Sequence, residues 1–385
     1  MSVSDLADPR VWPAEPAGNP WIAELHASAE AAIDASTGRE ADAFDANARH
    51  SLEVALATSN GSDLATIFSS APSAVVARHS RRLLADVERG DPAASESLRR
   101  TLFAIPVILV AALDAGAQPV TLTGVLQDTT LANTLRDARA FGGCETFALS
   151  PSLVATEALD IAALPALLAR RHVPENAGEF APGALDLPPA PIDIDTRVER
   201  VYLRFLAGAV LTPPRVDPLR ESNIGRWGIP FSQSLTTALH APGISLLALP
   251  RPPQPLVNAV QSGRAAQREV SAQVFASNAI RKFRASYGEP TAIISAHRCA
   301  DATGGGELRL SLSSPFAARE AEGFRCPIYP YETVQDVAAM LDALLRDCQV
   351  SDVRIMPGIH ADKDSITGGS LFFKNAGAST GEPLH

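Results

Sequence analysis

The clearest pattern of hydrophobic and polar positions along the chain lies between Gly243 and Gly358. Four short apolar or alternating runs predict strands there, at residues 244–249, 291–296, 308–313 and 353–356. Two longer runs with helical spacing predict helices, at residues 256–288 and 334–348. In the third run every second residue is leucine, so one face of that strand is expected to be buried and the other polar. The glycines at 304–306 predict a loop that joins the second and third strands into a hairpin.

The second of these helices has the most regular apolar stripe in the chain. Thr333 is the expected N-cap residue, with Asp336 three positions later. Leu341 lies at the centre of the stripe, so one whole face of the helix is expected to pack against a sheet. Asp342 lies about 100° further around the helix and is expected to face water.

These elements follow one another as strand, helix, strand, strand, helix, strand. That is the ferredoxin-like order, in which two right-handed crossovers place both helices on one face of a four-stranded antiparallel sheet. We therefore expect an α+β protein with a helical N-terminal region, followed by one or two ferredoxin-like units, one of them at residues 243–358.

An earlier stretch repeats part of this order. Strands are predicted at residues 103–111, 120–125 and 144–149, with a helix at 128–141 between the last two. Gln127 and Asp128 open that helix, as Gln335 and Asp336 open the later one. Two interpretations stay open, an internal duplication and a chance likeness between two amphipathic helices.

The patterns divide the chain into five segments. Residues 1–100 are the helical N-terminal region, and residues 101–174 form an α/β unit. Prolines are dense between Pro182 and Pro255, so residues 175–242 are expected to be a Pro-rich linker and a segment that packs on a domain. The ferredoxin-like unit covers residues 243–358, and residues 359–385 form a tail.

Composition narrows the class of protein. The chain has 385 residues, 46% of them hydrophobic and 20% charged, which is enough to build a core. Its net charge of −10 disfavours binding to nucleic acid, so RNA affinity tighter than about micromolar is not expected. The first residues lack a secretory signal, and the longest apolar run is too short to span a bilayer, so a cytoplasmic protein without a membrane partner is expected. The four cysteines form no CxxC pair and predict buried thiols, with no metal and no cofactor.

The pair His297 and Cys299 is the strongest catalytic candidate. It follows a predicted buried strand, and residues two apart on a strand share a face, so the thiol and the imidazole could meet as a nucleophile and a base. A catalytic pair also needs an oxyanion hole, which no motif supplies. A structural histidine in the core is the preferred interpretation.

A second group of polar residues occupies a loop rich in proline and glycine. The ligand-binding candidates are Arg220, Asn223, Arg226 and Trp227, with Arg298 beyond the hairpin strand. Ion pairs that tie the loop down would account for them equally well. The glycines at 304–306 lack the lysine and helix of a phosphate loop, and His360, Asp362 and Asp364 are too few for a metal site, so both are expected to be plain turns.

Several short motifs resemble a proteobacterial family that is catalogued only as a domain of unknown function. They lie at residues 269–271, 275–281, 288–292, 295–298, 305–316 and 323–327. The resemblance implies a cytosolic bacterial protein and supplies no activity, substrate or catalytic residue. The sequence thus favours a non-catalytic binding or regulatory protein that engages a protein partner or a small ligand. The alternatives are a hydrolase or transferase that uses His297 and Cys299, and an RNA-binding ferredoxin-like protein.

Overall fold

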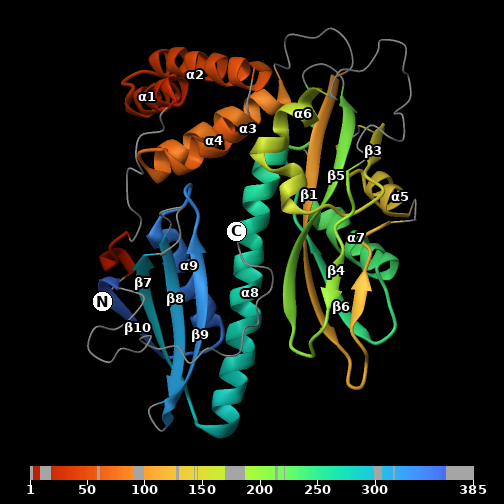
Figure 1. Cartoon of the computed structure of the whole chain (residues 1–385), viewed down its shortest axis with the longest axis vertical. Helices are drawn as coiled ribbons and strands as arrows, with labels where there is room; N and C mark the ends of the chain where they lie inside the picture. The colour runs from red at the N-terminus through yellow and green to blue at the C-terminus, as the bar shows by residue number, and fades with distance from the viewer. Residues whose placement is uncertain are drawn as a thin grey trace. The chain divides into compact units, whose positions relative to one another are not determined.

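A computed structural model describes residues 3–8, 19–58, 61–90, 99–126, 130–142, 144, 146–169, 187–212, 216–220, 222–298, 306–314 and 317–360. The chain forms two compact units (Figure 1). We call the first the β1 unit, which comprises Ala27–Thr66 and Ser80–Gln267. The second, the β7 unit, comprises Met1–His26, Ile67–His79 and Arg268–His385.

Helices occupy most of the described chain before the first strand. They are α1 (Pro20–Asp34), α2 (Gly38–Thr58), α3 (Gly61–Ser69) and α4 (Ala74–Arg89), and their residues are shared between the two units. Within the β1 unit, Leu52 and Ala55 of α2 are buried, and Arg82 of α4 donates to the carboxylate of Asp45 at 2.6 Å.

The β1 unit is built on a four-stranded sheet. Its elements are β1 (Arg99–Leu113), β2 (Val120–Leu122), α5 (Thr130–Asp137), β3 (Phe147–Leu149), η2 (Thr156–Leu159), η3 (Ile161–Ala163), α6 (Leu164–Ala169), β4 (Ile192–Ile194), β5 (Arg200–Thr212), α7 (Ile224–Ala238) and β6 (Ile244–Pro250). The strand order is β3-β5-β1-β6, and every neighbouring pair is antiparallel. Since β5 and β6 both run opposite to β1, they are parallel to each other, and α7 connects them around β1.

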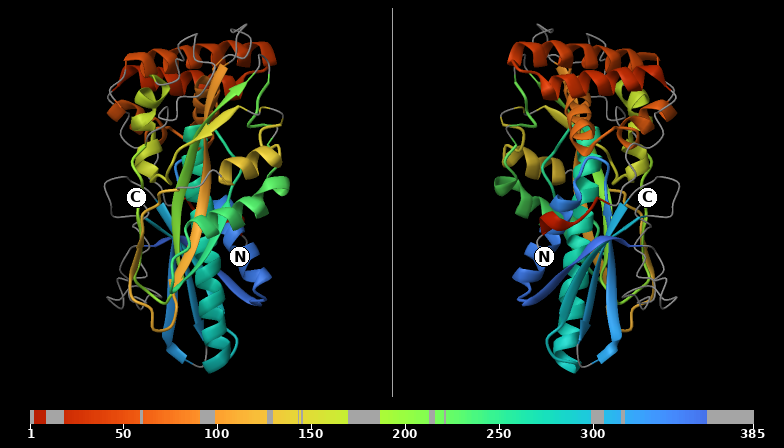
Figure 2. Two further views of the ribbon diagram at one scale, coloured as in Figure 1. Left: turned by 90° about the vertical axis from the view of Figure 1, so that its right-hand side faces the viewer. Right: turned by 90° about the vertical axis from the view of Figure 1, so that its left-hand side faces the viewer.

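Helices cover both faces of this sheet. Helices α5 and α7 lie side by side on one face (Figure 2), and Leu135, Trp227 and Phe231 share one core with Phe103 of β1. On the other face lies the first part of α8 (Leu256–Ser286), where a Cβ on Gly263 would come within 3.0 Å of Leu203 and Phe205 of β5. Close packing on both sides explains why β1 and β5 are almost continuously apolar.

The β7 unit has a second four-stranded sheet. Its elements are η1 (Val3–Asp5), the later part of α8, β7 (Thr291–Arg298), β8 (Gly306–Ser314), β9 (Ala317–Ile328), α9 (Val334–Asp347) and β10 (Asp352–His360). The order is β10-β7-β8-β9, with β10 parallel to β7 and the other neighbours antiparallel. One face is apolar and packs on α8 and α9.

Several local predictions for this unit are confirmed. The hairpin of β7 and β8 forms, with Leu308, Leu310 and Leu312 in the core. Thr333 is the N-cap of α9 and exchanges capping hydrogen bonds with Asp336. Leu341 is fully buried, as its stripe indicated.

The expected ferredoxin-like unit at residues 243–358 does not form as predicted, because its first strand belongs elsewhere. β6 pairs with β1, and the fourth strand of the second sheet is β9. Helix α8 has 31 residues, so it is about 46 Å long, roughly twice the length of the seven-residue β6. A helix of that length is poorly matched to a short return crossover between neighbouring strands.

The segment at residues 175–242 was expected to be a Pro-rich linker and a segment that packs on a domain, and its described part forms regular secondary structure. Its residues supply β4, the inner strand β5 and helix α7, all of them part of the β1 unit. The prolines at 188, 189 and 191 precede the three-residue β4, which pairs with β2, so they bound a short strand. Residues 170–186 lie outside the described part of the chain.

Candidate binding site

Strand β6 is an outer strand of its sheet, and its hydrogen bonds show which of its backbone groups point toward β1. Arg251 donates its amide to the carbonyl of Pro106 at 2.8 Å, and Asp114 donates to the carbonyl of Gly243 at 2.9 Å. In an antiparallel ladder, residues that bond to the neighbouring strand alternate with residues that do not. Residues 245, 247 and 249 therefore bond to β1, and the amides of Ile244, Leu246 and Ala248 point away from it.

The side chains of β6 alternate between the core and the opposite side of the sheet. Ile244 and Ala248 lie in the core beneath α7, so Leu247 points to the opposite side of the sheet, where it is 51% exposed. The Ser232 hydroxyl of α7 donates to the carbonyl of Ala248 and occupies that acceptor. No residue of β6 is charged, and its pairing with β1 has no irregularity.

The predicted loop residues lie close to the start of α7, and each has a different environment there. Asn223 is the N-cap of α7 and accepts a hydrogen bond from the amide of Gly225 at 3.0 Å. Arg220 and Arg226 are exposed. Trp227 is fully buried against Phe231, with ring centroids 5.5 Å apart, so its indole is a core group that no ligand can reach.

Arg298 belongs to a different place. It is the exposed last residue of β7, in the β7 unit, whereas the other four candidates are in the β1 unit. The five ligand-binding candidates are therefore divided between the two units.

His297 lies on the polar face of the β7–β8 hairpin. Its Nε2 is 2.8 Å from the hydroxyl of Ser295, and Glu307 is its cross-strand partner in the register. Glu307 accepts a hydrogen bond from Arg309, which lies opposite Ser295. These four side chains are all buried, and His297 is only 1% exposed. Cys299 lies outside the described residues, so the pair of His297 and Cys299 stays a prediction.

This buried group specifies the register of the hairpin. A shift of one residue would turn Glu307 and Arg309 toward the apolar face that packs on α8 and α9. The serine and the imidazole resemble a nucleophile and its base, but Ser295 is 2% exposed and lies within a regular strand. The geometry supports a structural role better than a catalytic one.

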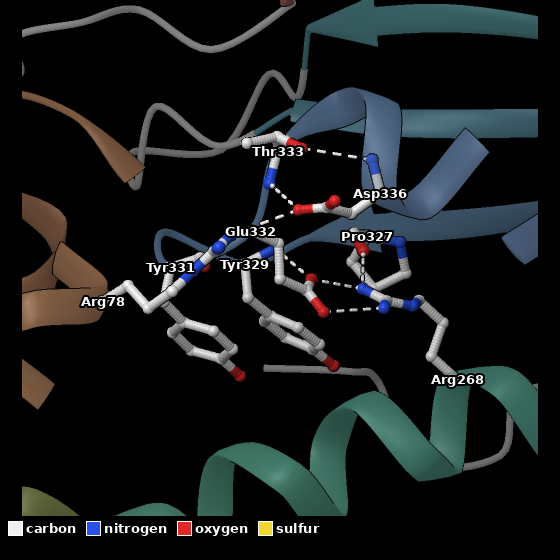
Figure 3. A network of polar contacts seen from close by, with 8 residues as sticks. All are labelled: Arg78, Arg268, Pro327, Tyr329, Tyr331, Glu332, Thr333 and Asp336. Carbon is white, nitrogen blue, oxygen red and sulfur yellow. Dashed lines mark hydrogen bonds and ion pairs between the residues drawn. The ribbon is translucent and has the colours of Figure 1, made fainter. Parts of the chain in front are cut away.

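A second polar network surrounds Arg268 at the turn between β9 and α9 (Figure 3). The guanidinium of Arg268 donates to both carboxylate oxygens of Glu332, one of them at 2.7 Å, and to the carbonyl of Pro327 at 2.8 Å. It also lies over the ring of Tyr329, 5.4 Å from the centroid, and that ring stacks on Tyr331. Burial alone would lower the pKa of Arg268, but the hydrogen bonds and charge of Glu332 outweigh it and raise that pKa.

The outer part of the network caps a helix. Arg78 donates to the carbonyl of Tyr331 at 3.4 Å and to the carboxylate of Asp336 at 3.2 Å. Hydrogen bonds from Thr333 and the charge of Arg78 lower the pKa of Asp336. The network as a whole joins α8 to the start of α9, so we infer that its role is to stabilise the folded β7 unit.

Of the three described cysteines, Cys326 is buried as expected, whereas Cys144 and Cys348 are half-buried. Cys326 is fully buried, and burial raises its pKa to about 12. Among the described residues, no group of histidine, cysteine or carboxylate side chains could hold a metal ion. His360 ends β10, and Asp362 and Asp364 lie outside the described residues. No helix in the described ranges is long and apolar enough to cross a membrane.

Comparisons with known proteins add no relative. No model of a protein family matches the chain, and neither a curated protein nor a solved structure does. The sequence patterns did not identify the edge of β6 as a binding site. The sequence contains a run of six uncharged residues, 244–249, followed by Pro250, but only the sheet order reveals that this run is an outer strand.

Proposed function

We propose that the protein is a cytosolic bacterial binding protein without catalytic activity, and that it engages a protein partner through strand addition at β6. In strand addition an extended segment of the partner hydrogen-bonds to an open sheet edge, and side chains that alternate along it give specificity. One observation carries the proposal: β6 is an outer strand with an uncharged, regular edge and an exposed Leu247.

The physical argument rests on how proteins protect sheet edges. An open edge is a template for another strand, so most edges carry charges, prolines or bulges. β6 has none of these before its last residue, Pro250. An edge left in this state is suited to a partner segment that is extended and uncharged, with an apolar side chain placed against Leu247.

The arrangement of the β1 unit supports a finer assignment of the fold. Six of the elements from β1 to β6 follow the ferredoxin-like order, namely β1, α5, β3, β5, α7 and β6, with the split βαβ unit of β5, α7 and β6 around β1. The short pair of β2 and β4 forms a separate two-stranded sheet, and η2, η3 and α6 lie between β3 and β4 along the chain. We therefore assign the ferredoxin-like fold to Arg99–Pro250. Its sheet differs from an RNA-binding sheet, because α8 covers the face that would stack bases.

The likeness to an uncharacterised proteobacterial family is part of the same proposal. The hydrolase alternative is less favoured, since His297 is buried beside Ser295 on a regular strand. A small-ligand alternative through Arg220, Asn223 and Arg226 is also less favoured, because Arg220 and Arg226 are exposed and Asn223 caps α7.

The experiment uses two synthetic peptides and the full chain. The first peptide alternates valine and threonine over eight residues, and in the second the two central residues are replaced by prolines, which cannot donate to a ladder. We expect the first peptide to bind and to shift the amide resonances of residues 244–248, and the second to bind at least about tenfold more weakly.

A protein variant provides the matched control. Leu247→Lys places a charge on the exposed rim of β6 without removing a core side chain, and it should weaken binding of the first peptide at least about tenfold. Thr237→Lys, at an exposed position of α7, should leave binding unchanged. Equal binding of both peptides, or no binding by either, contradicts strand addition at β6.

A further inference from the structure

The outer strand of the β7 unit, β10, differs from β6 in carrying charge in a regular pattern. Asp352 and Arg354 lie on the same face of β10, two residues apart, with Val353 between them. Arg354 donates to both carboxylate oxygens of Asp352, at 3.1 and 2.9 Å. Both side chains are exposed, 45% for Asp352 and 65% for Arg354.

This pattern is self-complementary. If two copies of β10 run antiparallel about a twofold axis at Val353, Asp352 of one copy lies opposite Arg354 of the other, and Arg354 lies opposite Asp352. Directly opposite side chains on an antiparallel pair have Cβ atoms about 5 Å apart, within reach of an ion pair. Two aspartates and two arginines would then alternate in one network across the twofold axis.

The backbone of β10 accepts this register. Within the described part of the chain, β10 has one neighbouring strand, β7, so its other edge is open. Backbone groups that point outward alternate along a strand, and Asp352 and Arg354 have the same parity. Whether odd or even residues point outward, the twofold axis at Val353 brings outward groups of both copies together.

The same strand limits how far the pairing extends. The register between β10 and β7 is irregular between Ile355 and Ile359, and Pro357 and Gly358 lie in that interval, with a positive φ of 78° at Gly358. A second strand would therefore pair over residues 351–355 and no further. The charges, the proline and the irregularity of β10 prevent most other strands from pairing with it. They still allow a second copy of the chain to pair in this one register.

We infer that the protein forms a symmetric dimer through antiparallel pairing of β10 with β10 of a second copy, with Asp352 and Arg354 exchanged across the axis. This dimer is independent of the proposed partner site on β6. Interfaces below about 1,000 Å² are weak, so monomer and dimer should be in rapid equilibrium. The fraction of dimer should rise as the protein concentration is increased to about 200 µM.

Sedimentation velocity across that concentration range tests the dimer. The natural chain should show a dimer whose Kd rises at least about tenfold in Arg354→Asp, where like charges face each other across the axis. Asp352→Arg should have the same effect for the same reason. Arg354 is exposed, so a thermal melt of Arg354→Asp should match that of the natural chain. Asp352 also accepts a hydrogen bond from the Thr291 hydroxyl of β7 at 2.9 Å, so Asp352→Arg should melt at a slightly lower temperature.

A mixing experiment tests the register. An equimolar mixture of the Arg354→Asp chain and the Asp352→Arg chain should dimerise again, because two aspartates of one then face two arginines of the other. The double variant D352R/R354D should also dimerise. Leu247→Lys, on β6, should leave the dimer unchanged, which separates this inference from the proposed function. A chain that stays monomeric, or a dimer that ignores the single charge reversals, overturns the inference.

Discussion

The two four-stranded sheets differ in what their faces and edges carry. In the β1 unit both faces of the sheet are apolar and lie under helices, and the outer strand β6 has no charged residue. In the β7 unit one face is apolar, while the other carries buried charged pairs such as Glu307 and Arg309. Its outer strand β10 carries the exposed pair of Asp352 and Arg354.

The two sheets therefore differ in how the pairing of their strands is made specific. Apolar packing holds most of the first sheet, where the buried guanidinium of Arg204 in the inner strand β5 donates to backbone carbonyls such as that of Pro191 at 2.7 Å. The uncharged edge of this sheet is suited to an extended segment of matching shape. Charged groups fix the register of the second sheet, and the same kind of group makes its edge selective. The comparison predicts that charge substitutions act mainly in the β7 unit and that volume substitutions act in both.

The largest expected effect comes from Glu332. Glu332→Ala leaves the buried guanidinium of Arg268 without its carboxylate and should lower the free energy of unfolding by about 3–5 kcal/mol. Arg78→Ala removes an exposed ion pair to Asp336 from the same network and should cost less than about 1 kcal/mol. Urea melts of the two variants check this, and equal losses would mean that the buried charge pair does not stabilise the turn.

Helix α9 provides the next comparison. Leu341→Ala empties a fully buried position and should cost about 2–5 kcal/mol. Asp342 does not face water as expected, because its side chain is only 20% exposed beside Arg346, with the paired atoms 2.8 Å apart. Asp342→Ala removes this ion pair and should cost less than about 1 kcal/mol. Denaturant melts of both variants decide whether the stripe around Leu341 is the packed face. A larger loss from Asp342→Ala would contradict the packing of α9.

Close packing of the first sheet is tested at Gly208. A Cβ there would lie 2.3 Å from the ring of Phe103 and 2.9 Å from the carbonyl of Ala148, so Gly208→Ala should cost about 1–3 kcal/mol. Gly38 has no atom within 4 Å of its Cβ position, and Gly38→Ala should be close to neutral. Thermal melts give the comparison, and a neutral Gly208→Ala would show that the sheet is less tightly packed than described.

The smallest expected effect is a dependence on pH. Hydrogen bonds from Thr333 and the charge of Arg78 hold the pKa of Asp336 below its usual value. Its stabilising contribution is therefore complete above the unfolded pKa of about 4 and is lost as the pH falls through the lower folded value. Asp336→Asn should therefore make the free energy of unfolding less dependent on pH below about pH 4. An unchanged dependence on pH would show that the charge of this cap contributes nothing.

Local features of the second sheet could be predicted from the sequence. The alternating leucines of β8, the capping pair of Thr333 and Asp336, and the stripe around Leu341 each depend on residues a few positions apart. Strand β9 was missed because its residues, such as Arg319 and Glu320, do not alternate between apolar and polar side chains.

Pairing between distant strands could not be predicted. The run that forms β6 has the composition of a buried strand, but its partner β1 lies more than a hundred residues earlier. Nothing within β6 distinguishes this partner from the nearer β7, so the outer position of β6, and with it the candidate site, required the structure. Trp227 was misplaced for a related reason, since its loop-like neighbours conceal a helix whose core face it fills.

Amide hydrogen exchange at two adjacent residues tests the central claim most directly. The amide of Leu247 bonds to β1, whereas that of Leu246 points away from the sheet. In the free chain Leu246 should exchange much faster than Leu247, and addition of the alternating valine–threonine peptide should slow Leu246 while leaving Leu247 unchanged. If Leu246 is already as protected as Leu247 in the free chain, or if the peptide does not slow it, β6 is not an open edge for a partner strand.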